Sequence, residues 1–271
     1  MELAFVKMHG LGNDFMVVEW PRGSPPPSAA TVRAWADRRT GIGFDSLLIV
    51  DRGASGAKPS YRVFNADGGE SEQCGNGARC IARWLAPKPD STLALQSAGG
   101  IVEAHVLEDG YVTVNLGEPS FRPAALPFVA AEADRYRRTL PSGDVEFGAV
   151  SMGNPHVVIA VDSVETAPVG ILGPGLAAHR DFPSSVNVGF MQRLDDARIR
   201  LRVYERGVGE TRACGTGAAA AVAVGRRWGI LGDEVAVSLP GGVLTVRWKG
   251  PGSALWQTGP TTRVYEGRIE L

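Results

Sequence analysis

The fold of this chain is decided by a stretch that it contains twice, Tyr61-Arg-Val-Phe-Asn-Ala-Asp-Gly-Gly-Glu-Ser-Glu-Gln-Cys-Gly-Asn-Gly77 and Leu201-Arg-Val-Tyr-Glu-Arg-Gly-Val-Gly-Glu-Thr-Arg-Ala-Cys-Gly-Thr-Gly217. The two copies align without a gap, 140 positions apart, and share Arg, Val, Gly, Glu, Cys, Gly and Gly at equivalent places. A long internal repeat indicates a fold built from similar units. We therefore predict two homologous halves.

Two further pairs of segments support the duplication. Residues 12–18, which begin Gly-Asn, resemble residues 153–159, and residues 97–101 resemble residues 238–243. The three pairs occur in the same order along the chain, and their spacings are nearly equal. Chance agreement would not preserve both order and spacing, so the repeat extends over most of each half.

Both halves carry the same secondary-structure signals. A helix is predicted directly after each repeated cysteine, over residues 75–85 and 216–228, and another over residues 29–39. The proline-rich residues 21–28 predict a surface loop, and residues 134–143 predict a connection near the join of the halves. Short segments rich in β-branched residues predict strands at 46–51, 61–65, 100–107, 111–116, 157–161, 198–205, 234–238 and 243–249.

These elements predict an α+β protein made of two pseudo-symmetric lobes. The N-terminal lobe is expected to span residues 1–120 and to be completed by a C-terminal strand over residues 261–271. The C-terminal lobe is expected to span residues 121–260. A cleft between two lobes is the usual place for a small-molecule site, and we predict the active site there.

Composition excludes several classes of function. The 28 basic and 29 acidic residues give a net charge of −1, and no basic block offers a footprint for nucleic acid or an anionic membrane. No stretch approaches the roughly 20 apolar residues of a membrane span, and residues 1–7 do not resemble a signal peptide. We predict a cytoplasmic protein. Its three cysteines should be free thiols, because three in a chain this long do not form a disulfide framework and an odd count argues against one.

Cys74 and Cys214 stand apart from an ordinary buried cysteine. Each precedes Gly-x-Gly and a predicted helix, and the N–H groups and dipole of a helix N-terminus favour a thiolate and bind anions. Cys80 lies inside the first helix and has no counterpart in the second half, so we interpret it as a packing residue.

Two thiols that flank an anion site suit the inversion of an amino-acid Cα. One group removes the α-proton while the other delivers a proton to the opposite face. Helix N–H groups that hold the substrate carboxylate would stabilise the developing charge. The cysteines lie in separate motifs without zinc-ligand spacing, so we predict no metal, and the absence of an evident phosphate loop predicts no pyridoxal phosphate or other cofactor.

Over nearly its whole length the sequence resembles the diaminopimelate epimerases. This resemblance implies two lobes, each a mostly antiparallel sheet curled into a barrel around a central helix, and a homodimer. It also implies interconversion of LL- and meso-diaminopimelate, a step toward lysine and peptidoglycan. The matching segments are Met8–Phe15, Gly41–Asp45, Asn65–Gly68, Cys74–Cys80, Gly153–His156, Asn187–Phe190 and Glu205–Gly217.

The resemblance also implies roles for individual residues. It makes Cys74 and Cys214 the acid–base pair. It places Glu205 among the substrate-binding residues and His156 among the supporting ones, both near the thiols, whose protonation they could adjust. The backbone that holds the reacting carboxylate would come from Gly75, Asn76, Gly215 and Thr216. The distal end of the substrate would be held by Asn13, Asn65, Asn154, Asn187 and Arg206. At Ser46 the chain departs from the family, many members of which carry Gln or Gly there.

Other interpretations remain open at this point. An Asn after Gly is often a turn residue, His156 could cap a loop, and capping or loop roles are favoured for Glu70 and Glu210. The same scaffold could serve a proline or histidine racemase, although a proline-type pocket should be more apolar. A proton-shifting isomerase of similar fold would lack both cysteines. A thiol redox sensor, finally, would use the pair as a disulfide.

Overall fold

The computed structural model describes residues 2–53, 57–71 and 74–270. The chain divides into two compact units, one formed by residues 1–114 with 259–271 and the other by residues 115–258. Within the described residues, none of the helices has the length and apolar character needed to span a membrane.

The first unit is a mixed sheet with two helices. Its strands are hydrogen-bonded in the order β18, β1, β2, β3, β4, β6, β7, β8, and β5 pairs with the end of β4. The elements are β1 (Glu2–Gly10), β2 (Asn13–Glu19), α1 (Ala29–Ala36), β3 (Ser46–Asp51), β4 (Ser60–Asn65), β5 (Glu70–Ser71), α2 (Gly75–Leu85), β6 (Ser91–Ser97), β7 (Gly100–Val106), β8 (Val112–Asn115) and β18 (Thr262–Glu270).

The second unit repeats this arrangement. Its strands are ordered β9, β10, β11, β12, β13, β15, β16, β17, and β14 pairs with the end of β13. The elements are the short 3₁₀ helix η1 (Pro123–Ala125), β9 (Tyr136–Leu140), β10 (Gly143–Ser151), β11 (Pro155–Ala160), α3 (Val169–Ala177), β12 (Asn187–Arg193), β13 (Arg198–Glu205), β14 (Gly209–Thr211), α4 (Gly215–Arg227), β15 (Glu234–Leu239), β16 (Gly242–Arg247) and β17 (Trp256–Gly259).

The two units share one topology, down to the direction of each strand pair. In the first, β2 is parallel to β3 and β4 is parallel to β6, while the other pairs are antiparallel. In the second, the parallel pairs are β11 with β12 and β13 with β15. The predicted α+β class and the duplication are therefore confirmed.

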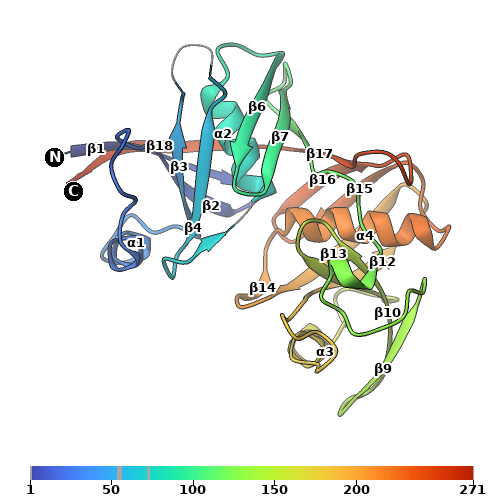
Figure 1. Ribbon diagram of the computed structural model, residues 1–271. Coiled ribbons are helices and arrows are strands. Elements are labelled where there is room, and N and C mark those ends of the chain that lie inside the picture. Colours follow the sequence, from blue (N-terminus) through green and yellow to red (C-terminus); the bar gives the residue numbers. More distant parts are fainter. Residues whose placement is uncertain (1, 54–56, 72–73, 271) are drawn as a thin grey trace. The chain divides into compact units, whose positions relative to one another are not determined.

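Each unit wraps its sheet around one buried helix. Helix α2 contacts β1, β2, β3, β6 and β7, and α4 contacts β10, β11, β12, β13 and β16, as the ribbon shows for each unit (Figure 1). Residues 75–82 of α2 and most of α4 are buried. A helix in contact with so many strands lies inside a curled sheet, so its N-terminus is held rigidly.

Strands next to the central helix are apolar on both faces because a second helix covers the outer face. In the first unit Met16, Val18 and Leu47 pack with Val32 and Trp35 of α1. In the second, α3 contributes Val169 and Leu176 to the equivalent outer core. The continuous apolar runs in β2, β3, β11 and β12 reflect this double coverage.

The structure corrects two local predictions. Residues 134–143 contain strand β9, which pairs with β10, rather than a plain connection. The helix predicted over residues 29–39 ends at Ala36, because the Asp37 carboxylate accepts hydrogen bonds from the backbone N–H of Arg39 and Thr40 and closes a turn.

Candidate active site

Cys74 is the N-cap of α2. Its φ of −141° and ψ of 107° place it outside the helix, and its Sγ accepts a hydrogen bond from the Gly77 N–H at 3.4 Å. A Cβ at Gly77 would lie 3.1 Å from the Leu48 side chain and 3.4 Å from the Cys74 Cβ. Glycine therefore lets this N–H approach the sulfur.

Asn13, at the start of β2, contacts the Cys74 cap. Its Oδ1 accepts a hydrogen bond from Asn76 Nδ2 at 3.1 Å and lies 4.0 Å from Cys74 Sγ. Asn76 is the second residue of α2 and is buried. The structure thus brings together three residues that the sequence analysis selected separately.

Ser46 and Asn65 lie at the same end of the first sheet. They are directly paired across β3 and β4, and Ser46 is also paired with Phe15 of β2. Ser46 is buried, whereas Asn65 is exposed and its backbone closes the turn that leads to Gly69. Ser46 begins β3 and Asn65 ends β4, and the chain continues from Asn65 through β5 to the Cys74 cap.

Cys214 is the N-cap of α4, with φ −114° and ψ 109°, and it is buried. A Cβ at Gly217 would lie 3.2 Å from its Sγ and 3.0 Å from Val203, so this position also requires glycine. The sulfur lies 3.7 Å from the hydroxyl oxygen of Thr216. The second unit reproduces the cysteine cap with different neighbours.

Glu205 is the neighbour that most distinguishes Cys214 from Cys74. Burial raises the pKa of the Cys214 thiol well above its usual range, and the Glu205 carboxylate raises it further through its charge and a hydrogen bond with the thiol. Glu205 also accepts a hydrogen bond from the Thr211 hydroxyl. This environment keeps Cys214 protonated at neutral pH.

His156 joins the same group from β11. Its Nε2 lies 3.0 Å from both Asn154 Oδ1 and Thr216 Oγ1, and Asn154 Nδ2 donates to the same hydroxyl at 3.3 Å. Burial, with the charge of Arg206 as a smaller cause, lowers the pKa of His156 to about 3. The imidazole is therefore neutral at physiological pH and works as a hydrogen-bonding group.

Asn187 ties three segments of the second unit together. Its Nδ2 donates to the Pro155 carbonyl at 3.0 Å, and its Oδ1 accepts from the Arg206 N–H at 2.9 Å. The Arg206 guanidinium donates to the Ser184 carbonyl at 2.9 Å, and the residue is exposed. Asn187 thus fixes the chain on which Arg206 is presented.

The capping or loop roles favoured for Glu70 and Glu210 are wrong. Glu70 forms a two-pronged ion pair with Arg62, both contacts at 2.7 Å, and Glu210 forms the equivalent pair with Arg202 at 2.6 and 2.8 Å. Each pair links neighbouring strands. The repeat itself contained the signal, since both Arg and Glu recur at the same spacing.

Cys80 is completely buried in α2, and burial raises its pKa to about 12, which fits the packing role predicted for it. Sequence reasoning missed two neighbours of the Cys74 cap, Arg79 and Asp45. Arg79 Nη2 donates to Asn76 Oδ1 at 2.6 Å, and Asp45 Oδ2 accepts from Asn13 Nδ2 at 2.9 Å. Both stood inside quoted motifs, but nothing in the pattern separated them from structural charges.

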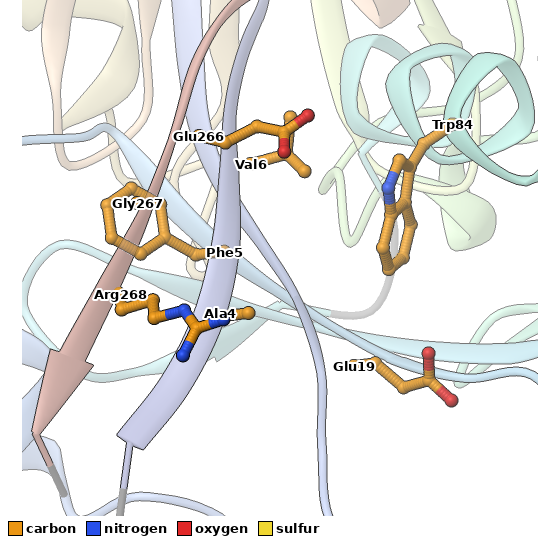
Figure 2. Close-up of a pocket in the computed structure, with 8 residues that line it drawn as sticks. All are labelled: Ala4, Phe5, Val6, Glu19, Trp84, Glu266, Gly267 and Arg268. Atoms are coloured by element: carbon orange, nitrogen blue, oxygen red, sulfur yellow. The ribbon is translucent and has the colours of Figure 1, made fainter.

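A hollow of about 420 Å³ in the first unit does not involve the cysteine cap. Figure 2 shows the Trp84 ring on one side and side chains of β1 and β18 on the other. None of the residues predicted for the site lines it. The lining residues are Ala4, Phe5, Val6, Glu19, Trp84, Glu266, Gly267 and Arg268.

The cysteine caps define the class of protein. Each α+β unit presents one thiol at the N-terminus of its central helix, an end whose dipole and backbone N–H groups favour an anion. One thiol lies near a carboxylate and the other near a guanidinium, which suits a pair that exchanges protons with a substrate. These are the features of a two-base isomerase.

The chain belongs to the diaminopimelate epimerase family. The family model described as diaminopimelate epimerase matches residues 5–122 and 148–264. Diaminopimelate epimerases of Pseudomonas aeruginosa (strain LESB58) and Nitrosomonas europaea are 50% and 49% identical to it, and each alignment covers 100% of both chains.

Solved structures share the fold at lower identity. A hydroxyproline epimerase from Agrobacterium vitis has a TM-score of 0.72 at 18% identity and covers 99% of this chain and 92% of its own. A probable proline racemase from Agrobacterium radiobacter has a TM-score of 0.72 at 16% identity, with 99% and 93% covered. At such identities the likeness establishes the fold alone.

Proposed function

We propose that this isomerase interconverts LL- and meso-diaminopimelate by two-base proton transfer, with Cys74 and Cys214 as the bases. The observation that carries the proposal is the recurrence of one cysteine cap on the central helix of both units, in a member of this family. The reaction inverts one Cα and therefore needs two groups that reach the same carbon from opposite faces.

The proposed step balances without any other reactant. One cysteine, as thiolate, takes the α-proton, and the electron pair of the C–H bond passes to the substrate carboxylate. The other cysteine, as thiol, returns a proton to the opposite face, so the enzyme ends with the two protonation states exchanged. No pyridoxal phosphate or metal is part of this proposal.

The first turns of α2 and α4 support a role in holding the reacting carboxylate. Gly75 and Asn76 begin one helix and Gly215 and Thr216 the other, and the backbone N–H groups of a helix's first turn point toward its end, where they can donate to an anion. Such groups stabilise an enediolate-like intermediate, since negative charge grows on the carboxylate as the proton leaves. This stabilisation would be largest in the transition state.

We propose that the polar residues at the strand ends hold the distal amino-acid group of the substrate. Arg206 and Asn65 are exposed, and Arg206 can bind a carboxylate in two-pronged fashion. Asn13, Asn154 and Asn187 complete the set, and Glu205 and His156 adjust the protonation of the second thiol. Where relatives carry Gln, the shorter Ser46 of this chain would leave room for water or substrate.

Two further proposals follow from the family and the surface. We propose that the protein is a homodimer in the cytoplasm. Strand β18 exposes Val264 and Tyr265, with 53% and 45% of their surfaces accessible, on the strand that also borders the hollow of Figure 2. Sedimentation of wild type and Tyr265→Glu tests whether this strand lies in the dimer interface.

The substrate assignment is tested by α-proton exchange in deuterated water under reducing conditions, followed by NMR. LL- and meso-diaminopimelate, proline and histidine are supplied separately to wild type, Cys74→Ala and Cys214→Ala. We expect exchange with diaminopimelate alone, and loss of inversion in both variants. Exchange with proline or histidine would replace the substrate but keep the mechanism, and inversion by either variant would reject the two-thiol mechanism.

A further inference from the structure

The side chains beside Cys74 form a hydrogen-bonded chain with a charged group at each end. Arg79 Nη2 donates to Asn76 Oδ1 at 2.6 Å, and Asn76 Nδ2 donates to Asn13 Oδ1 at 3.1 Å. Asn13 Nδ2 then donates to Asp45 Oδ2 at 2.9 Å. We propose that Arg79 and Asp45 are positioning residues that fix the Asn13 amide with its carbonyl oxygen toward the Cys74 sulfur.

The two ends of the chain determine its direction. A guanidinium has only donors, and a carboxylate has only acceptors. Asn76 must therefore turn its oxygen toward Arg79, and Asn13 must turn its NH₂ toward Asp45. Because the chain can run in one direction only, Asn13 presents an acceptor to Cys74 Sγ, which lies 4.0 Å from that oxygen.

The Asp45 end is held by further contacts. Asp45 Oδ2 also accepts from the Asp14 N–H at 3.0 Å, and its Oδ1 accepts from Arg38 at 2.7 Å. Arg38 binds both oxygens of Asp14 at 2.7 and 3.0 Å, and Lys7 pairs with the same carboxylate. This network leaves the Asp45 carboxylate little freedom to rotate.

The Arg79 end is buried. None of the Arg79 side chain reaches the surface, and burial lowers its pKa to about 10, so it still carries its charge at pH 7. A Cβ at Gly10 would lie 3.4 Å from Arg79 Nη2, so glycine there leaves space for the guanidinium. The charge attracts a thiolate at Cys74. Position 219, the equivalent in α4, is alanine.

This arrangement gives both protonation states of Cys74 a partner. The Gly77 N–H at 3.4 Å serves the thiolate, and the Asn13 oxygen serves the thiol. Tyr61 and Cys80 also interact with Cys74, and burial raises the pKa of both, so they are neutral at pH 7. A cysteine that alternates between the two states needs both partners, an argument that rests on the proposed acid–base role of Cys74.

The test is the pH dependence of Cys74 alkylation by iodoacetamide, read by mass spectrometry of the Cys74 peptide without substrate. Arg79→Gln removes the cation, so the midpoint should move to higher pH, with alkylation at pH 7 slowed roughly tenfold. Arg79→Lys retains a donor-only cation and should restore most of the rate. Asp45→Asn removes the acceptor-only end, so Asn76 alone orients the Asn13 amide; part of the population should then turn its NH₂ toward the sulfur, and the midpoint should move to lower pH.

A double-mutant cycle separates amide orientation from a direct charge effect. In an Asn13→Ala background, Asp45→Asn should no longer move the midpoint. Asp51→Asn removes another carboxylate of the same unit, one paired with Arg22, and should leave the curve unchanged. Equal midpoints in all variants, or an Asp45 effect that persists without Asn13, would overturn the proposal.

The same variants distinguish this proposal from the proposed function. Circular dichroism establishes that each is folded, and if Arg79→Gln fails to fold, the Asp45 and Asn13 cycle still decides. In folded Arg79→Gln and Asp45→Asn we expect epimerase kcat to fall about tenfold or more, with KM less affected. Shifted midpoints in a protein that cannot epimerise diaminopimelate would support the positioning role and reject the substrate.

Discussion

Helices α2 and α4 have the same topological position, the same cysteine cap and the same Gly-x-Gly start, yet groups of opposite charge lie beside their two thiols. Cys74 lies near Arg79 and the amides of Asn13 and Asn76, whereas Cys214 lies near Glu205. Position 15, equivalent to His156, is a phenylalanine. A duplicated scaffold therefore preserves where the thiols stand while their surroundings differ in sign.

This difference shows how a duplicated fold can favour different protonation states for two thiols in equivalent positions. A guanidinium favours a thiolate, and a carboxylate favours a thiol. The pair would then rest as one base and one acid, ready for one direction of proton transfer, and would exchange these states after each turnover. Two identical environments would favour equal charges on both sulfurs and would leave the pair without an acid or without a base.

Glu205→Gln should have the largest effect among the variants that break this asymmetry. We expect kcat to fall roughly 100-fold or more, because the carboxylate adjusts the acid–base state of Cys214. Its loss lowers the pKa of Cys214, so the limb of the pH–rate profile due to this thiol should move to lower pH. Glu210→Gln removes a nearby carboxylate that pairs with Arg202, and it should leave kcat within about twofold.

His156→Phe gives the second unit the residue that the first unit has at the equivalent position, Phe15. It should change how the free energy of unfolding depends on pH. The folded pKa of about 3 lies below the usual 6.5, so the unfolded chain binds the proton more tightly. Stability from neutral His156 is complete above pH 6.5 and is lost as pH falls toward 3, by about 3 kcal/mol between pH 7 and 4.5.

Denaturant unfolding at several pH values checks this expectation. His156→Phe should lose stability at pH 7, since Asn154 and Thr216 lose a hydrogen-bonding partner, and should lose less than wild type on acidification. The same substitution at the partly exposed His105 provides the control. Equal acid sensitivity of wild type and His156→Phe would contradict the burial of a neutral imidazole.

Asn187 and Ser46 are the first residues of the equivalent strands β12 and β3, so Asn187→Ala and Ser46→Ala compare what each contributes to stability. Asn187 bonds the Pro155 carbonyl and the Arg206 N–H, so its loss should cost about 2 kcal/mol in unfolding free energy. Ser46 is also buried, but Ser46→Ala removes only a hydroxyl, so it should lower the unfolding free energy by less than about 1 kcal/mol. Urea midpoints measure both, and a larger cost at Ser46 would show that the first unit depends on this hydroxyl.

The smallest effect on stability is expected for the Arg–Glu ion pair that both units have at equivalent positions. Glu70→Gln and Glu210→Gln each remove one of the strand-linking ion pairs, and each should cost no more than about 1 kcal/mol because the pairs are partly exposed. Thermal unfolding at low and high salt measures both. Unequal costs would show that these pairs, too, have diverged between the halves.

The duplication, the two cysteine-capped helices and about half of the strands could be predicted because they depend on patterns that recur. The strands at residues 46–51 and 198–205 and the helix at 75–85 have the predicted bounds. Strand β9 was missed because its sequence, Tyr-Arg-Arg-Thr-Leu, reads as a polar connection, and only its pairing with β10 makes it a strand. An edge strand of this kind is determined by its partner more than by its own residues.

The amino-acid sequence by itself determined the duplication, the α+β class and the two cysteine-capped helices, because these follow from local spacing, turn residues and periodicity. Only the tertiary structure decided that Arg79 and Asp45 terminate one hydrogen-bonded chain, that a carboxylate lies beside Cys214, and that a neutral histidine bonds the Thr216 hydroxyl near that thiol. The Asn76–Asn13 and His156–Thr216 bonds join residues 63 and 60 positions apart in the chain. The protonation of a buried group depends on burial and charge in three dimensions.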